Sequence, residues 1–210
     1  MKLLLPALAA SLALILGCSK TPEPLAIPLV PLSVQMQGAA VHRGKAIVTE
    51  TFSLLSSNLQ SAVKTSGVSN ALPFCSLAAS PLTAGMAGKH GVTIRRVTHK
   101  ARNPAGTADA IELAILKQFE AAWSTATATN PPLPIVTNFT ATTATFFAPI
   151  ILNNELCLKC HGEPGKDIAP ENVATIERLY PQDEATGFKL GDLRGAWRVD
   201  IPLAALGSGK

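Results

Sequence analysis

Apolar residues recur at spacings of three to five positions between residues 34 and 65, with serine, threonine, glutamine and asparagine between them. This period is typical of an amphipathic helix, and Gly67 is a suitable stop. A second helix is predicted over residues 70–87. Pro73 is tolerated near its start, whereas Pro81 is expected to kink or split it.

The rest of the chain alternates short strand patterns with helices. Thr107 is the expected N-cap of a helix that runs to about residue 124, and Asn153 or Asn154 can cap a short helix at residues 155–161. A further helix is predicted at 170–179, and strands at 92–98, 135–139, 143–151 and 196–203. Together these elements predict an α+β fold: an antiparallel β-sheet with flanking helices, preceded by a long N-terminal helix.

The first 17 residues have the layout of a secretory signal peptide, one Lys followed by an apolar run. Residues 15–18, Ile-Leu-Gly-Cys, resemble a bacterial lipobox, which implies cleavage before Cys18 and a lipid on its thiol; the alternative is a buried Cys beside an uncleaved anchor. Residues 18–33 contain four prolines and predict an extended tether. We expect a domain at 34–210, held by its lipid in the periplasm or at the outer membrane of a Gram-negative bacterium.

The net charge is +4, and no Lys/Arg block is long enough to indicate a nucleic-acid surface. We therefore expect no nucleic-acid partner. Four cysteines are present: Cys18 at the lipobox, a lone Cys75, and the pair Cys157 and Cys160. An odd thiol in an oxidising compartment requires an explanation.

The stretch Cys157-Leu158-Lys159-Cys160-His161 carries the clearest chemical signal. Two thiols three residues apart can form thioethers with the two vinyl groups of one haem, and the adjacent His can ligate the iron. We expect one covalent haem c, with His161 as proximal ligand. The alternatives are a redox disulfide and half of a zinc site, although no second Cys/His pair is present for zinc.

The opposite face of the iron has several candidate ligands. Cys75 can ligate ferric iron as thiolate, or it can be a buried, inert thiol. The other candidates are Met36, His42, Met86, His90 and His99.

The order of four sequence pieces resembles a family of bacterial single-haem c-type domains with a PAS-like fold, catalogued as a domain of unknown function. The pieces span residues 72–75, 91–104, 157–162 and 191–196. The resemblance implies a PAS-like antiparallel sheet and a haem ligated by His on one side and Cys on the other. On this chain that pair is His161 and Cys75.

Four basic residues are candidate partners for the haem propionates, since cationic side chains, and guanidinium groups above all, pair well with carboxylates; they are Arg95, Arg96, Lys100 and Arg102. The alternative for each is a solvated charge at a strand edge.

We expect a protein that carries electrons to a partner protein or reports redox state, rather than an enzyme. Thiolate ligation predicts a low midpoint potential. The rival hypothesis is a gas-binding or peroxidase-like haem protein with a labile sixth ligand, for which His99 and Arg102 are the candidate distal pair. A third is a structural lipoprotein that holds zinc.

Overall fold

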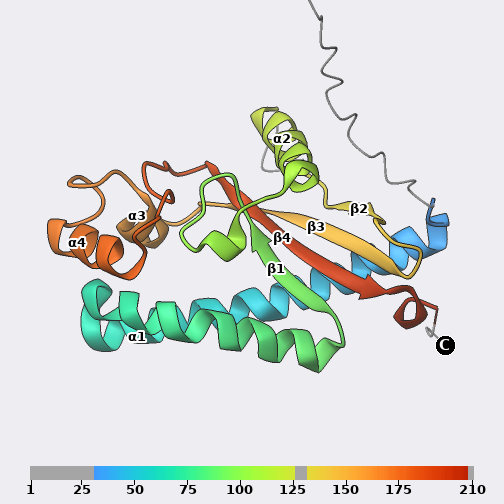
Figure 1. The fold of residues 1–210 in the computed structure, drawn as a ribbon, viewed down its shortest axis with the longest axis horizontal. Helices are drawn as coiled ribbons and strands as arrows, with labels where there is room; N and C mark the ends of the chain where they lie inside the picture. The colour runs from blue at the N-terminus through green and yellow to red at the C-terminus, as the bar shows by residue number, and fades with distance from the viewer. Residues whose placement is uncertain (1–30, 126–131, 208–210) are drawn as a thin grey trace, which may run out of the picture.

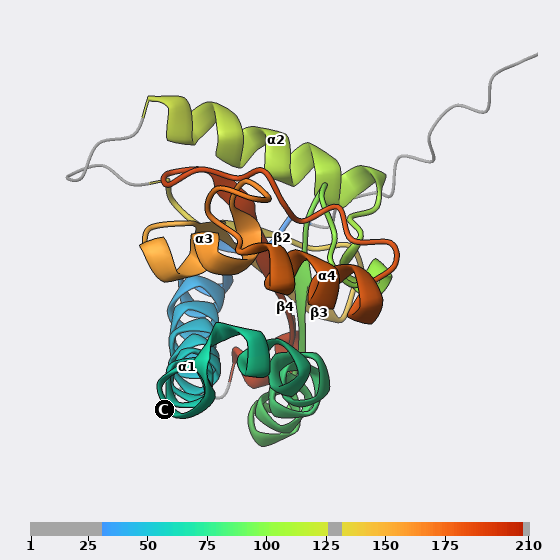
Figure 2. The same cartoon turned by 90° about the vertical axis from the view of Figure 1, so that its left-hand side faces the viewer.

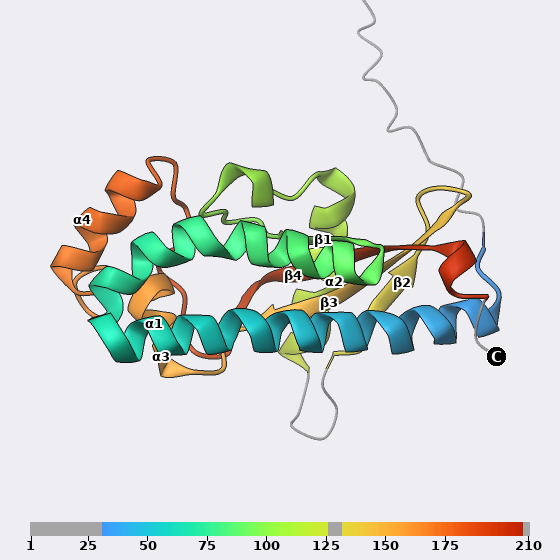
Figure 3. The same ribbon diagram turned by 90° about the horizontal axis from the view of Figure 1, so that it is seen from below.

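The computed structural model describes residues 31–125 and 132–207, without the side chains of Phe74 and Cys75. Helix α1 (Val34–His90) starts at Ser33, whose hydroxyl accepts from the Met36 amide, and ends at Gly91 in the left-handed conformation. Its backbone is non-helical at Gly67, with φ of 74°, which suits glycine. The two halves of α1 therefore double back and run side by side beneath the sheet (Figures 1 and 3).

The described strands form one antiparallel sheet in the order β1-β4-β3-β2. Strands β3 and β4 pair along most of their length, with a bulge between Ile150 and Ile151. The four strands are β1 (Thr93–Val97), β2 (Ile135–Thr137), β3 (Thr143–Ile151) and β4 (Leu193–Pro202). The predicted α+β class, the antiparallel sheet and the long N-terminal helix are confirmed.

Helices cover both faces of the sheet (Figure 1). Neighbouring strand residues point to opposite faces, so Phe147 packs with Phe119 of α2 (Ala110–Ser124). Phe146 packs instead with Ile47 and Met86 of α1. The sheet is therefore the middle layer of three.

Gly44 sets how closely α1 approaches the sheet. A Cβ on this residue would lie 2.3 Å from the ring of Phe146, which is fully buried. Hydrogen is the only side chain that fits at this crossing without movement of the helix or the ring.

The structure corrects two predictions about helix boundaries. The N-cap of α2 is Asp109, not Thr107: the Asp109 carboxylate accepts from the Ile111 and Glu112 amides, and the Glu112 side chain accepts from the Asp109 amide. Thr107 instead follows the 3₁₀ helix η1 (Pro104–Gly106). Pro81 does not split α1, because the break in helical backbone inside α1 is at Gly67.

Helices α3 (Glu155–His161) and α4 (Pro170–Leu179) gather at one end of the sheet, above the turn of α1 (Figure 2). At the other end a second 3₁₀ helix, η2 (Leu203–Ala205), follows β4. Within residues 31–125 and 132–207, no helix combines the length and apolar character that a bilayer span requires.

Candidate functional site

Helix α3 carries Cys157, Cys160 and His161 in less than two turns. Asn154 caps its start by accepting from the Leu156 amide at 2.8 Å. Gly162 follows the helix directly. A Cβ added at this position would lie 2.5 Å from the Cβ of Asp167 and 2.7 Å from the Leu158 carbonyl oxygen, so only glycine fits without movement. Sequence and packing thus fix a short helix of defined length.

The last carbonyl groups of a helix have no hydrogen-bond donor within the helix. Here the donors come from the loop between α4 and β4 and from Arg102. The Phe188 amide donates to the His161 carbonyl at 2.9 Å, and the Gly187 amide donates to the Gly162 carbonyl at 2.8 Å. The Cys160 carbonyl accepts from Nη2 of Arg102 at 2.6 Å. The Cys-x-x-Cys-His segment is therefore held rigidly.

The His161 ring is oriented by the same loop. Its Nδ1 lies 2.8 Å from the Ala185 carbonyl oxygen, and its ring meets the edge of Phe188 at 6.4 Å between centroids. A carbonyl oxygen can only accept, so Nδ1 donates and the neutral imidazole keeps its lone pair on Nε2. This is the arrangement that a metal-ligating histidine needs.

Electrostatics favour the neutral imidazole. Desolvation by burial lowers the pKa of His161 well below 6.5, and the positive charges of Arg194, Arg102 and Arg96 lower it further, against the opposing hydrogen bond to Ala185. The ring is therefore unprotonated at neutral pH and can act as a ligand without losing a proton.

The two thiols of α3 face different apolar clusters. Cys157 packs with Leu152, Ala185 and Phe188, whereas Cys160 packs with Leu72 and Ile176 among others. Both cysteines are half-buried, so α3 holds both thiols in an apolar setting.

The second half of α1 docks against this end of the molecule through one face. Ser69 donates to Asn172 of α4 at 2.6 Å, and Leu72 packs in the cluster that contains Cys160. Cys75 belongs to the same helix, three residues beyond Leu72, but its side chain lies outside the described structure. Its predicted role as axial ligand stays a prediction.

The other candidates for the sixth ligand lie in different environments. Met86 is buried in the core between α1 and the sheet, and His90 pairs with Glu50 at 2.8 Å. His42 is exposed, and Met36 is at the start of α1. His99 is nearest to the site, because its ring meets Phe188 at 6.3 Å between centroids.

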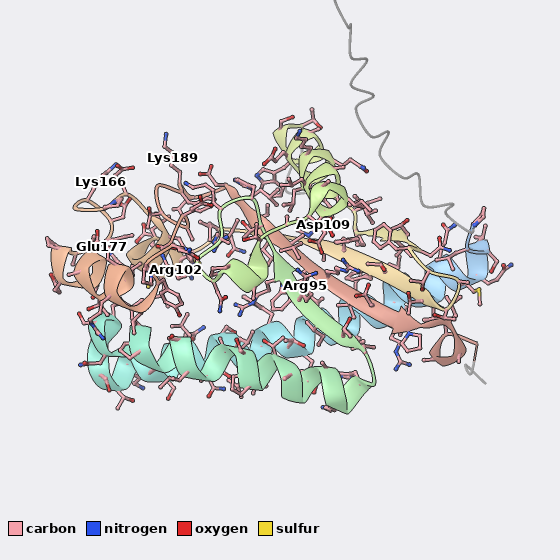
Figure 4. The ribbon with its side chains drawn as sticks, in the orientation of Figure 1. Arg95, Arg102, Asp109, Lys166, Glu177 and Lys189 are labelled. Carbon is pink, nitrogen blue, oxygen red and sulfur yellow. The ribbon has the colours of Figure 1, made fainter. Side chains whose placement is uncertain are left out.

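The four basic residues predicted as propionate partners have different neighbours in the described structure, and their role towards the haem stays a prediction. Arg95 donates to the buried Glu112 at 3.1 Å, and Arg96 lies over the Trp197 ring. Arg102 makes a two-point pair with Asp183 at 3.0 and 3.1 Å, and Lys100 donates to the Thr186 carbonyl. Figure 4 shows Arg95 on β1 and Arg102 nearer α3 and α4.

Sequence reasoning missed three residues of the site: Ala185, Phe188 and Arg194. Phe188 contacts both His161 and His99, and Nζ of Lys100 lies 4.6 Å from its ring centroid. The guanidinium carbon of Arg194 lies 5.3 Å from the same centroid. Residues 191–196 were singled out as a motif, which was the only available signal for Arg194; nothing in the sequence marked the other two.

Two cavities flank the site. One of about 380 Å³ lies between α2 and the loop before β4, and its lining includes His99, Trp123 and Phe188. A smaller one of about 150 Å³ borders α4, with Ile176, Tyr180 and Asp183 in its lining. Among the described residues, no group of three or more His, Cys, Asp and Glu side chains is arranged to hold a metal ion.

Fold and site together define a class: an α+β domain with a three-layer core and a rigid Cys-x-x-Cys-His helix at one end. The model of the Tll0287-like family matches residues 33–202, most of the chain. The protein therefore belongs to the Tll0287-like family. No curated protein matches the sequence.

A solved structure has the same fold. It is described as the crystal structure of the cyanobacterial heme-protein Tll0287, and the two chains superpose with a TM-score of 0.52 at 23% sequence identity. The match covers 81% of this chain and 97% of the other. At this identity the likeness establishes the shared fold.

Proposed function

We propose that the protein binds one haem c covalently, through thioethers at Cys157 and Cys160. One observation carries the proposal: α3 presents both thiols next to an imidazole whose Nδ1 is engaged by the Ala185 carbonyl. Apolar clusters on both sides of α3 suit a macrocycle. The family match and a fold neighbour described as a heme-protein support it.

His161 is the proposed proximal ligand and Cys75 the proposed ligand on the other side. Ser69 and Leu72 face α4 and the Cys160 cluster, and residues three apart in a helix share a face. Position 75 continues that face by one turn. When bound, a haem with thiolate ligation supplies one-electron chemistry at low potential.

The proposed role is electron transfer or redox sensing outside the cytoplasm, in a lipoprotein anchored through Cys18. A tethered domain with a six-coordinate haem exchanges electrons without binding a substrate at the iron. The redox partner is a protein that the sequence does not identify. A PAS-like topology remains part of the proposal rather than of the described fold.

The test of this role is the ferric EPR spectrum of the wild type beside Cys75→Ala, together with the midpoint potential. A low-spin thiolate signal that the substitution removes, with a low midpoint, supports the proposal. A high-spin spectrum that the substitution leaves unchanged, with rapid CO binding after reduction, favours an open iron and a gas-binding role instead.

The peroxidase alternative receives no support from the described residues. A peroxidase needs a distal Arg free to meet bound peroxide, and Arg102 is committed to Asp183 and to the Cys160 carbonyl. These partners of Arg102 disfavour it as a distal arginine beside His99.

A further inference from the structure

Arg194 is a half-buried cation, and among the described residues no carboxylate forms an ion pair with it. The ion pairs of the described residues engage Arg95, Arg102 and Arg198, but none engages Arg194. Its Nη1 donates to Thr98 Oγ1 at 2.9 Å and to the Lys100 carbonyl at 3.0 Å, whereas its Nε is buried without a hydrogen-bond partner. Removing a charged group of this kind from water is costly unless something compensates it.

The backbone around Arg194 is built to bring it inward. Gly195, at φ of 153°, sits where a Cβ would lie 2.4 Å from the Val97 carbonyl oxygen, so β4 approaches β1 closely at this point. The Thr98 hydroxyl also donates to the Arg194 carbonyl at 2.8 Å. Hydrogen bonds with Thr98 thus hold both the backbone and the guanidinium group of Arg194 in place.

Arg194 shares the Phe188 ring with His161. Its guanidinium carbon lies 5.3 Å from the ring centroid, and the His161 ring lies 6.4 Å from it. Burial lowers the pKa of Arg194 to about 10, and the charges of Arg102 and Arg96 act in the same direction, against the opposing charge of Asp183. An anion at this place would relieve a concentration of positive charge beside the proposed haem site.

We propose that Arg194 binds a propionate carboxylate of the haem and that its charge raises the haem's midpoint potential. The inference rests on the proposed function, because it requires a bound haem. The carboxylate accepts from the unpaired Nε, which supplies the missing acceptor. A fixed cation beside the haem disfavours the ferric state, which carries one more positive charge than the ferrous state.

The test is potentiometry of the holoprotein with Arg194→Met, preceded by a haem assay. Removal of one charge is expected to raise the ferric-to-ferrous ratio at fixed ambient potential by roughly tenfold, a midpoint fall of about 59 mV for one electron. The matched control is Arg198→Met, which removes the same charge from the α2 side of the sheet, where Glu112 is its partner; its midpoint is expected to stay at the wild-type value.

The outcomes separate the two proposals. Absence of haem from the wild type overturns the proposed function itself. Haem with an Arg194→Met midpoint equal to that of the wild type, or to that of Arg198→Met, overturns the role of Arg194 alone. If Arg194→Met does not fold, Arg194→Lys keeps the charge but not the Nε donor; resonance Raman should then show a shifted propionate-bending band, and an unshifted band overturns the inference.

Discussion

Nη2 of Arg102 donates to the carbonyl oxygen of Cys160 at 2.6 Å, and the same nitrogen lies 3.0 Å from Oδ2 of Asp183. The Arg102 guanidinium therefore connects α3 to the loop between α4 and β4, whose Ala185 carbonyl orients His161. Both side chains are mostly buried, at 13% exposed for Arg102 and 7% for Asp183. This ion pair stabilises the position of α3 relative to the loop.

Arg102→Met is expected to lower the free energy of unfolding by about 3–5 kcal/mol, because it leaves Asp183 buried without its partner. Denaturant unfolding monitored by circular dichroism measures this. Asp183→Asn keeps an oxygen that can accept from the Ala185 amide, so the double variant Arg102→Met/Asp183→Asn should be more stable than Arg102→Met. A double variant no more stable than the single one would contradict the stabilising role of the Arg102–Asp183 ion pair.

Gly162→Ala is expected to destabilise the end of α3, since its Cβ would collide with Asp167 and with the Leu158 carbonyl. Overpacking of this kind costs about 1–3 kcal/mol. The control is Gly88→Ala in α1, where a Cβ meets nothing within 4 Å and helix propensity favours alanine. Thermal unfolding should move down for the first variant and up for the second; equal shifts would argue against the tight turn.

Gly44→Ala tests the contact between α1 and the sheet. The methyl group would overlap the Phe146 ring, so a loss of about 1–3 kcal/mol is expected. Gly38→Ala, six residues earlier in the same helix, meets nothing within 4 Å and should be neutral or stabilising. If both variants unfold at the same denaturant concentration, α1 does not pack on β3 as described.

Glu50 joins the two halves of α1 through Lys89 and His90. The hydrogen bond from Lys89 lowers the pKa of Glu50 from 4.5, and His90 acts in the same direction against partial desolvation. A lowered pKa in the folded state contributes stability above pH 4.5 that is lost as the pH falls through the folded value. Wild type should therefore exceed Glu50→Gln in stability at pH 7 and match it in strong acid; a difference independent of pH would refute this.

Local signals predicted most of the elements. The 3.6-residue period and Gly67 gave the two halves of α1, and Pro170 marked the first residue of α4. The cap of α2 was missed although Asp109 and Glu112 have the spacing of a capping box. That error was avoidable, since the signal is local.

The surroundings of the site could not be predicted in the same way. The Cys-x-x-Cys-His motif is local, but the Ala185 carbonyl and the Phe188 ring reach His161 from 24 and 27 positions along the chain. The partners of the arginines are equally remote: Arg95 meets Glu112 across the face of the sheet. Pairings of this kind arise from tertiary structure, which residue spacing does not encode.

The central claim is covalent haem attachment at α3, and the intact mass of the denatured protein tests it most directly. Full-length protein is produced in a periplasm with active c-haem maturation, beside a Cys157→Ser/Cys160→Ser variant. The account predicts that the wild type carries the added mass of one haem after denaturation and that the variant carries none. A wild-type mass equal to that of the polypeptide alone would contradict it.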